Sequence, residues 1–136
     1  MLFLFYFYPA KIFSLKHLHQ DKSRAHKQSV ISMMLRKRRN DYDFDYIFER
    51  QVEAFGNKGD MAIGISTSGS SKNVVAGILK ASKMGLKTAA LTGSKKGDLF
   101  KIADLCVRVP SENTPRVQEA HIAIGHIVCE LIEDAL

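Results

Sequence analysis

From Met61 onward the chain alternates short apolar runs with amphipathic stretches, and this alternation restricts the fold more than any other feature. Each apolar run is too short for a typical helix, so it predicts a buried strand. The runs are "MAIGIS" at 61–66, "KTAALTG" at 87–93 and "DLCVRVP" at 104–110. Strands that alternate with helices predict an α/β fold, here a three-layer, doubly wound parallel sheet with helices on both faces. Sheets of this kind bind ligands at the carboxyl ends of their strands.

Apolar residues at helical spacing predict the helices of this fold. They lie in 43–56, 70–85 and 114–136, with one or two further helical turns within 94–103. Gly56 and Gly85 are predicted to end the first two helices, because glycine commonly follows a helix C-terminus. The inward-facing residues expected on the second helix are Val74, Val75, Ile78, Leu79 and Ala81.

The last predicted helix, 114–136, has apolar residues on more than one side. Thr114 is expected to cap it and Pro115 to occupy its first helical position. Its apolar residues are Val117, Ile122, Ile124, Ile127, Val128, Leu131 and Ile132. A helix that is apolar on several sides is usually buried on several sides. In a chain of 136 residues this predicts contact with a partner subunit.

The chain divides into two unequal parts, an atypical segment at 1–39 and a regular domain at 40–136. Its net charge of +6 and pI near 9.4 would suit a nucleic-acid-binding protein. The basic residues gather in 1–39, however, and acids and bases nearly balance from Asn40 onward. No aromatic-basic RNA motif or zinc-finger spacing accompanies them, so no nucleic-acid partner is expected. A basic nucleic-acid-binding protein is therefore the weakest functional hypothesis that the sequence supports.

Neither a membrane span nor a signal peptide is expected. The first eight residues are apolar but stop at Pro9, without a basic start or a small-residue cleavage site. A weak interfacial anchor is the alternative that this stretch leaves open. Cys106 and Cys129 lie in apolar runs and lack metal-ligand spacing, which favours reduced core cysteines and a cytoplasmic protein.

Small hydroxyl residues crowd the stretch "GISTSGSSKNV" at 64–74, directly between a predicted strand and a predicted helix. A helix N-terminus offers unpaired amides and a partial positive charge, so it favours an anion. Hydroxyl donors beside it suit the phosphate of a small metabolite. A nucleotide P-loop is disfavoured, because Ser70-Ser71 stands where that motif requires lysine. The alternative is that the serines only cap the helix and fill a turn.

Four stretches resemble the sugar isomerase (SIS) domain family, and within it the phosphoheptose isomerase branch. They are "GDMAIGISTSGSSKNV", "ALTG", "ADLCVRVPS" and "TPRVQEAHIAIGHIVCELIE", and the likeness runs from about Asn40 to the last residue. The resemblance implies a flavodoxin-like SIS fold and a cytoplasmic homotetramer. It also implies interconversion of sedoheptulose 7-phosphate and D-glycero-D-manno-heptose 7-phosphate, an aldose–ketose isomerisation that supplies nucleotide-heptose and lipopolysaccharide precursors.

The resemblance also implies roles for particular residues. The sugar phosphate would be held by Ser66, Thr67, Ser68 and Ser71, and the substrate would also contact Asn40, Asp41 and Gln118. His126 would be the catalytic acid or base. In zinc-bearing members of the family, Gln118 and His126 are metal ligands. The two are eight residues apart, which on a helix is roughly 80° of rotation, so both can reach one pocket, whereas His121 is expected to point elsewhere.

One family feature does not match. Upstream of the residues equivalent to Asn40-Asp41, the family carries a glycine-rich loop and a helix with His and Glu four apart, and 1–39 contains neither. We therefore expect this segment to be disordered, replaced, truncated or misread, the zinc site to be incomplete, and isomerase activity to be weak or absent. The alternative is a non-catalytic SIS module that senses a phosphosugar or binds a protein, as replication-initiator-associating proteins do. His126 favours the isomerase, and the missing glutamate favours the module.

Overall fold

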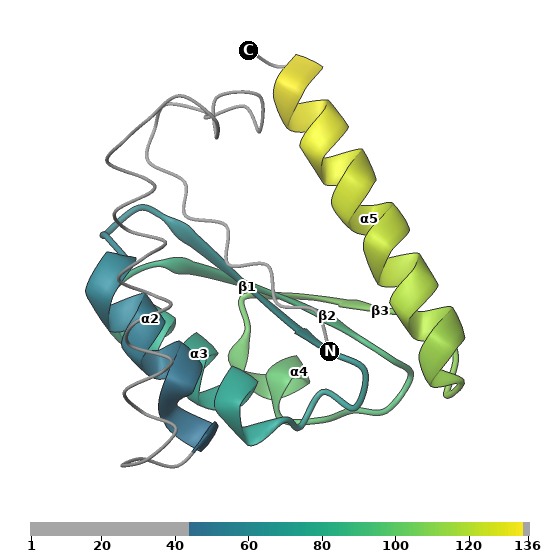
Figure 1. The fold of residues 1–136 in the computed structure, drawn as a ribbon, viewed down its shortest axis with the longest axis horizontal. Helices are drawn as coiled ribbons and strands as arrows, with labels where there is room; N and C mark the ends of the chain where they lie inside the picture. Colours follow the sequence, from purple (N-terminus) through teal and green to yellow (C-terminus); the bar gives the residue numbers. More distant parts are fainter. Residues whose placement is uncertain (1–43, 135–136) are drawn as a thin grey trace.

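The computed structural model describes residues 44–134, which form a parallel sheet with helices on both faces (Figure 1). The elements in chain order are the 3-10 turn η2 (Phe44–Tyr46), α2 (Ile47–Phe55), β1 (Met61–Ser66), α3 (Lys72–Lys83), β2 (Lys87–Thr92), α4 (Leu99–Ile102), β3 (Leu105–Arg108) and α5 (Thr114–Asp134). The predicted α/β class, all three strands and the helices between them are confirmed. Asn40, Asp41 and the segment 1–39 lie outside the described residues.

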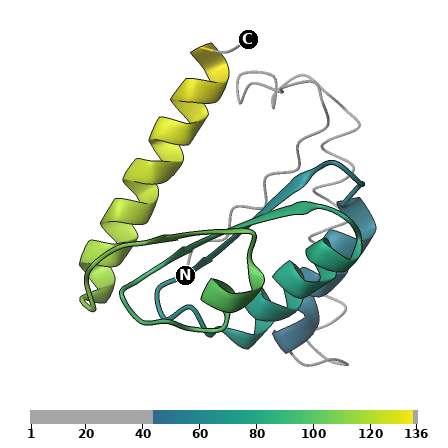
Figure 2. The ribbon, with the colours of Figure 1, turned by 180° about the vertical axis from the view of Figure 1, so that it is seen from behind.

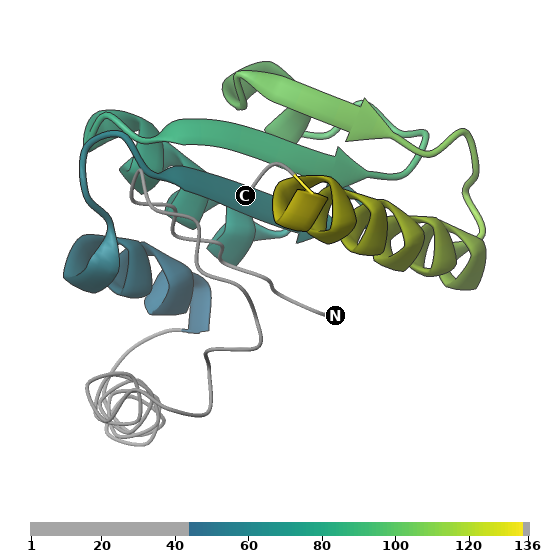
Figure 3. The same ribbon diagram turned by 90° about the horizontal axis from the view of Figure 1, so that it is seen from above.

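The three strands are parallel and lie in the order β1-β2-β3 (Figure 3). The register pairs Ser66 with Thr92 and Thr92 with Arg108, so the carboxyl ends of all three strands meet at one edge. Helices α2, α3 and α4 lie on one side of the sheet and α5 on the other, as the two opposite views show (Figures 1 and 2). Within residues 44–134 no helix is long and apolar enough to cross a bilayer.

The hydrophobic core lies between the sheet and α3. Its buried members are Val52, Ala62, Val74, Ile78, Ala81, Leu86, Ala90 and Leu99. Gly64 lets α3 approach β1 closely, because a Cβ there would lie 2.8 Å from Ile78 Cγ1. Leu79 was expected to face this core, but it is 42% exposed. The helix packs along one stripe through Val74, Ile78 and Ala81, and Leu79 lies about 100° around the helix from Ile78.

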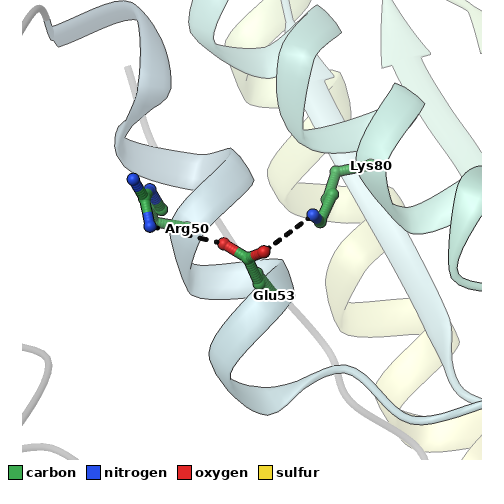
Figure 4. A network of polar contacts seen from close by, with 3 residues as sticks. All are labelled: Arg50, Glu53 and Lys80. Atoms are coloured by element: carbon green, nitrogen blue, oxygen red, sulfur yellow. Dashed lines mark hydrogen bonds and ion pairs between the residues drawn. The ribbon is translucent and has the colours of Figure 1, made fainter.

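Helix α2 packs on α3 through Phe48 and Val52 and ends at Gly56, as predicted. An ion pair crosses between the two helices: Lys80 Nζ lies 2.9 Å from Glu53 Oε1, and Arg50 reaches the other carboxylate oxygen (Figure 4). These side chains are partly solvated, so the pair contributes about 0–1 kcal/mol. Apolar packing is therefore the main contact that holds α2 in place.

Two helix ends test the capping predictions. Gly85 follows α3 with φ +79°, a left-handed conformation that glycine adopts without strain, so its predicted role at the helix end is confirmed. At α5 the cap is Asn113 rather than Thr114: Asn113 Oδ1 accepts the Arg116 amide hydrogen at 3.4 Å, and Thr114 is already helical. Both residue types cap well, and only the backbone decides which one occupies the position.

The starts of β2 and β3 are joined by one carboxylate. Asp104 Oδ2 accepts hydrogen bonds from the Thr88 amide at 2.8 Å and from Thr88 Oγ1 at 2.9 Å, and the Asp104 amide donates back to Thr88 Oγ1. The Thr88 backbone N–H, followed by its hydroxyl, lowers the pKa of Asp104 below its ordinary value of 3.8. The folded chain therefore favours the ionised form.

The stability contributed by Asp104 is expected to depend on pH. A carboxyl whose pKa is lowered by folding stabilises the protein above its unfolded pKa, and this contribution is lost as pH falls through the folded pKa. The stability gap between the wild type and Asp104→Asn should therefore be widest near neutral pH and close in acid. Thermal unfolding of both between about pH 3 and pH 7 measures the gap, with exposed Asp98→Asn as the control. A gap that stays constant across this range contradicts the prediction.

Candidate functional site

The serine loop, defined here as residues 66–71, joins the end of β1 to the start of α3. Ser66 is the last residue of β1 and is buried, whereas Ser68 and Ser70 are exposed. Gly69 has φ +71°, which turns the chain from the strand into the helix. The hydroxyl residues thus stand at the carboxyl edge of the sheet, where the sequence predicted them.

Three serine hydroxyls of this loop form one cluster. Ser66 Oγ lies 2.9 Å from Ser71 Oγ and 3.3 Å from Ser68 Oγ, and it accepts the Gly69 amide hydrogen at 3.2 Å. Each hydroxyl can rotate its hydrogen toward a different acceptor. The cluster can therefore turn donors toward an anion that arrives at the loop.

The α3 N-terminus lies beside this cluster and is not capped by its N-cap residue, although the Val74 amide in its first turn donates to Asn73 Oδ1 at 2.9 Å. Ser71 occupies the N-cap position, but its hydroxyl bonds Ser66 instead of an α3 amide. The first turn of α3 contains no Asp or Glu and begins with exposed Lys72. Free amides, a partial positive charge and hydroxyl donors are the features that bind phosphate at a helix start. The simple capping explanation therefore fails for Ser71.

A second loop, residues 93–98, supports the serine loop from beside it. The amides of Gly93 and Leu99 donate to the carbonyls of Thr67 and Gly69 at 3.0 and 2.9 Å. The backbones nearly touch, because a Cβ at Gly97 would lie 2.4 Å from the Gly69 carbonyl carbon. Sequence reasoning missed this support. Its only signal was the pair of glycines, Gly93 and Gly97, after the second strand.

Replacing Gly97 by alanine is expected to push the two loops apart. The new Cβ would lie 2.4 Å from Gly69 C and 2.6 Å from Ser70 Oγ, and the backbone atom cannot rotate away. We expect a loss of about 1–3 kcal/mol in unfolding free energy and weaker binding of inorganic phosphate. Denaturant unfolding and a phosphate titration measure both. Gly125→Ala is the steric control, because its Cβ would meet nothing within 4 Å beyond its own helix backbone and chain neighbours, and alanine there should not lower stability. Wild-type values for Gly97→Ala in both experiments would refute the prediction.

Helix α5 carries the remaining candidates, Gln118 and His126, and both side chains are exposed. Neither makes a hydrogen bond or ion pair with any other residue in 44–134. His121, by contrast, is buried and faces the end of β2, where its Nε2 lies 3.2 Å from the Thr92 carbonyl oxygen. The described chain therefore assembles the serine cluster but does not link Gln118 or His126 to it, and their roles stay predictions.

Within 44–134, no three His, Cys, Asp or Glu side chains lie close enough together to hold a metal ion. Gln118 and His126 alone do not form a tetrahedral zinc site, which needs four ligands or three ligands and a water. Cys106 and Cys129 are free and half-buried.

The family follows from a match along the chain itself. The SIS domain family model matches residues 13–93, which is more than half of the 136 residues. The chain belongs to the SIS domain family. The match includes residues 13–39, which were expected to lie outside the domain. The domain boundary at residue 40 stays a prediction.

Relatives and solved structures agree with this assignment. The chain is 56% identical over 97 residues to the phosphoheptose isomerase of Thermodesulfovibrio yellowstonii, and 52% identical over 94 residues to that of Sulfurimonas denitrificans. These alignments cover 71% and 69% of this chain and 48% of each relative. The chain therefore spans about half the length of the curated relatives that it matches.

Two solved structures show the same arrangement of elements. Phosphoheptose isomerase from Neisseria gonorrhoeae aligns with a TM-score of 0.71 and 38% identity, over 74% of this chain and 57% of that one. The enzyme from Francisella tularensis aligns with a TM-score of 0.68 and 38% identity, over 72% of this chain and 55% of that one. The predicted SIS fold is thereby confirmed.

Proposed function

We propose that the serine loop binds the phosphate of a sugar phosphate and that the chain acts as a phosphoheptose isomerase. The observation that carries the proposal is the joined hydroxyl cluster of Ser66, Ser68 and Ser71 beside the uncapped start of α3. It occurs in a chain about half identical to phosphoheptose isomerases over the aligned residues. The proposed substrate is sedoheptulose 7-phosphate and the product D-glycero-D-manno-heptose 7-phosphate.

The proposed reaction moves a proton between C1 and C2 of the sugar through an enediol, and the chain supplies binding and proton transfer. Ser66, Ser68 and Ser71 would donate hydrogen bonds to the phosphate, with Thr67 beside them, and so fix one end of the substrate. His126 would hold or release the proton at the reacting carbon or oxygen, and Gln118 would hydrogen-bond the sugar hydroxyls. Asn40 and Asp41 are proposed as further substrate contacts.

Zinc is proposed only as a cofactor of a more complete site. Gln118 and His126 would supply two of its ligands, and the others would come from outside residues 44–134 or from another copy of the chain. Bound zinc would polarise the sugar oxygens as a Lewis acid. No step assigned here to the residues of the chain depends on it.

We further propose that the protein works as a homo-oligomer, a tetramer, in the cytoplasm, where its product would enter heptose synthesis for lipopolysaccharide. The support is the outer surface of α5, where large apolar side chains are exposed. They are Ile122, Ile127, Val128 and Leu131. Exposed apolar residues that share one helix commonly mark a protein interface.

A non-catalytic SIS module that senses a phosphosugar or binds a partner protein is the second candidate function. It is favoured by one observation: the serine cluster is built from the end of β1 and the loop before α3, and within residues 44–134 no hydrogen bond links it to His126 on α5. A phosphate site of this kind could therefore work without the catalytic histidine.

Turnover distinguishes the two functions. The purified chain would be incubated with sedoheptulose 7-phosphate, with and without added zinc, and the aldose product followed over time. Appearance of the heptose 7-phosphate supports the isomerase. Binding of sedoheptulose 7-phosphate without any product supports the sensing module. A failure to bind it at all rejects both the isomerase and the sensing of this sugar phosphate.

A further inference from the structure

His121 is a buried imidazole that the proposed reaction does not use. It is 5% exposed, and the only other buried side chain among those described on α5 is Val117, which lies one turn earlier. Both residues belong to the N-terminal half of α5 and are buried, while the C-terminal half of the helix extends away from the sheet (Figures 1 and 2). Of the two, only His121 can form a directional contact.

That contact is made to a carbonyl at the end of β2. His121 Nε2 lies 3.2 Å from Thr92 O, and because a carbonyl only accepts, Nε2 must carry the hydrogen. The same oxygen accepts the Val109 amide hydrogen at 2.9 Å. One carbonyl thus joins α5, β2 and the segment that follows β3.

The same stretch of backbone also supports the serine loop. Gly93, the next residue after Thr92, donates its amide hydrogen to Thr67 O at 3.0 Å. A Cβ at Gly93 would lie 3.5 Å from Val117 Cγ2, so α5 packs on the same peptide. The chain of contacts from His121 to the serine loop therefore runs through only Thr92 and Gly93.

We propose that His121 is a positioning residue: its Nε2–H holds α5 at a fixed rotation and height over the end of β2, beside the serine loop. Gln118 lies three residues before it and His126 five residues after it, so any rotation or slide of α5 about this contact moves both. For its catalytic consequence this inference rests on the proposed function. A small misplacement of reacting groups is enough to lower turnover greatly.

The alternative to a positioning role is that the other ring nitrogen of His121, Nδ1, contacts a ligand or a partner chain directly. His121 Nδ1 is buried and has no hydrogen-bond partner among the described residues. If Nδ1 acted directly on a ligand or a partner chain, a side chain that replaces only the Nε2–H donor would not restore function. Glutamine is such a side chain, because its amide N–H can reach about as far as Nε2–H and it has no counterpart of Nδ1.

Kinetics of His121→Phe and His121→Gln test the proposal in the full chain. The Phe variant removes the donor and is expected to lower kcat by about 10-fold to 100-fold. The effect on KM for sedoheptulose 7-phosphate should be smaller, because the serine cluster keeps its own hydrogen bonds. The Gln variant should recover most of the lost kcat. Equal impairment of both variants, or wild-type kcat in the Phe variant, overturns the proposal.

Two measurements decide the matter without turnover. Long-range proton–nitrogen NMR of the wild type should show His121 with its hydrogen on Nε2, and an Nδ1–H ring would overturn the assigned contact. Hydrogen exchange should be faster in α5 of the Phe variant than in the wild type or the Gln variant, with β1 and α3 unaffected. Equal exchange in all three proteins rejects the positioning role, and a wild type without turnover rejects the proposed function instead.

Discussion

Replacing Ser66, Ser68 and Ser71 together by alanine is expected to weaken binding of sedoheptulose 7-phosphate by at least about 100-fold. A hydrogen bond to a charged group contributes about 1.5–3 kcal/mol, and each 1.4 kcal/mol is tenfold in affinity. Three lost donors would exceed 100-fold if their effects added, but the amides of Lys72 and Asn73 at the start of α3 remain and retain part of the binding. Isothermal titration with the sugar phosphate and with inorganic phosphate measures the loss.

The triple variant needs a check on folding, because Ser66 is buried and its hydroxyl bonds both neighbouring serines. Thermal unfolding shows whether the fold is intact, and the single variant Ser68→Ala, at an exposed position, serves if the triple variant does not fold. The matched control is Ser82→Ala, an exposed hydroxyl near the other end of α3. Unchanged affinity in a folded triple variant would contradict the proposed phosphate site, and the proposed substrate with it.

The elements of the fold could be predicted because each carries its own periodic signal. "MAIGIS" at 61–66 and "KTAALTG" at 87–93 are short apolar runs, and the strands occupy 61–66 and 87–92, the second ending one residue earlier than expected. The position of the serine loop followed from the same reasoning, since a loop between a parallel strand and its helix must lie at the carboxyl edge of the sheet. The local sequence pattern was sufficient to predict the features that depend on residues close together in the sequence.

Contacts between distant segments were beyond the sequence. The packing of Gly97 on Gly69 joins residues 28 positions apart, and no periodic pattern reports it. Whether Asn113 or Thr114 caps α5 depends on the residue at which helical backbone angles begin, and the sequence does not show this. Rotation on the helix correctly separated His121 from His126, but it could not show that His121 meets the Thr92 carbonyl.

The apolar pattern of α5 predicted the helix correctly but did not show what covers its apolar side chains. Its apolar residues were expected to be buried on several sides, yet Ile127 and Leu131 are 55% and 63% exposed in the single chain. The pattern and the exposure agree if a second copy covers this surface, which is the proposal made above. A size measurement in solution tests it, and a clean monomer would contradict it.

Replacing His126 by glutamine is expected to lower kcat for the isomerisation by about 10²–10⁴-fold, the usual contribution of a positioned acid or base. Glutamine has a similar size and an amide that forms hydrogen bonds, but its side chain cannot take up or release a proton near neutral pH. Because the serine cluster lies at the end of β1 and in the loop before α3, apart from α5, affinity for the sugar phosphate should be nearly unchanged. The variant therefore separates binding from proton transfer, which no serine variant can do.

His126→Gln needs a control variant on the same helix that does not affect proton transfer. Ala123→Ser, at a small exposed position three residues earlier, should keep wild-type kcat and KM. If His126→Gln also keeps wild-type kcat, another group transfers the proton and the carry-over of this role from the family fails. If it instead raises KM and leaves kcat unchanged, His126 contacts the substrate without acting as acid or base, because loss of a proton-transfer group would lower kcat and kcat/KM equally.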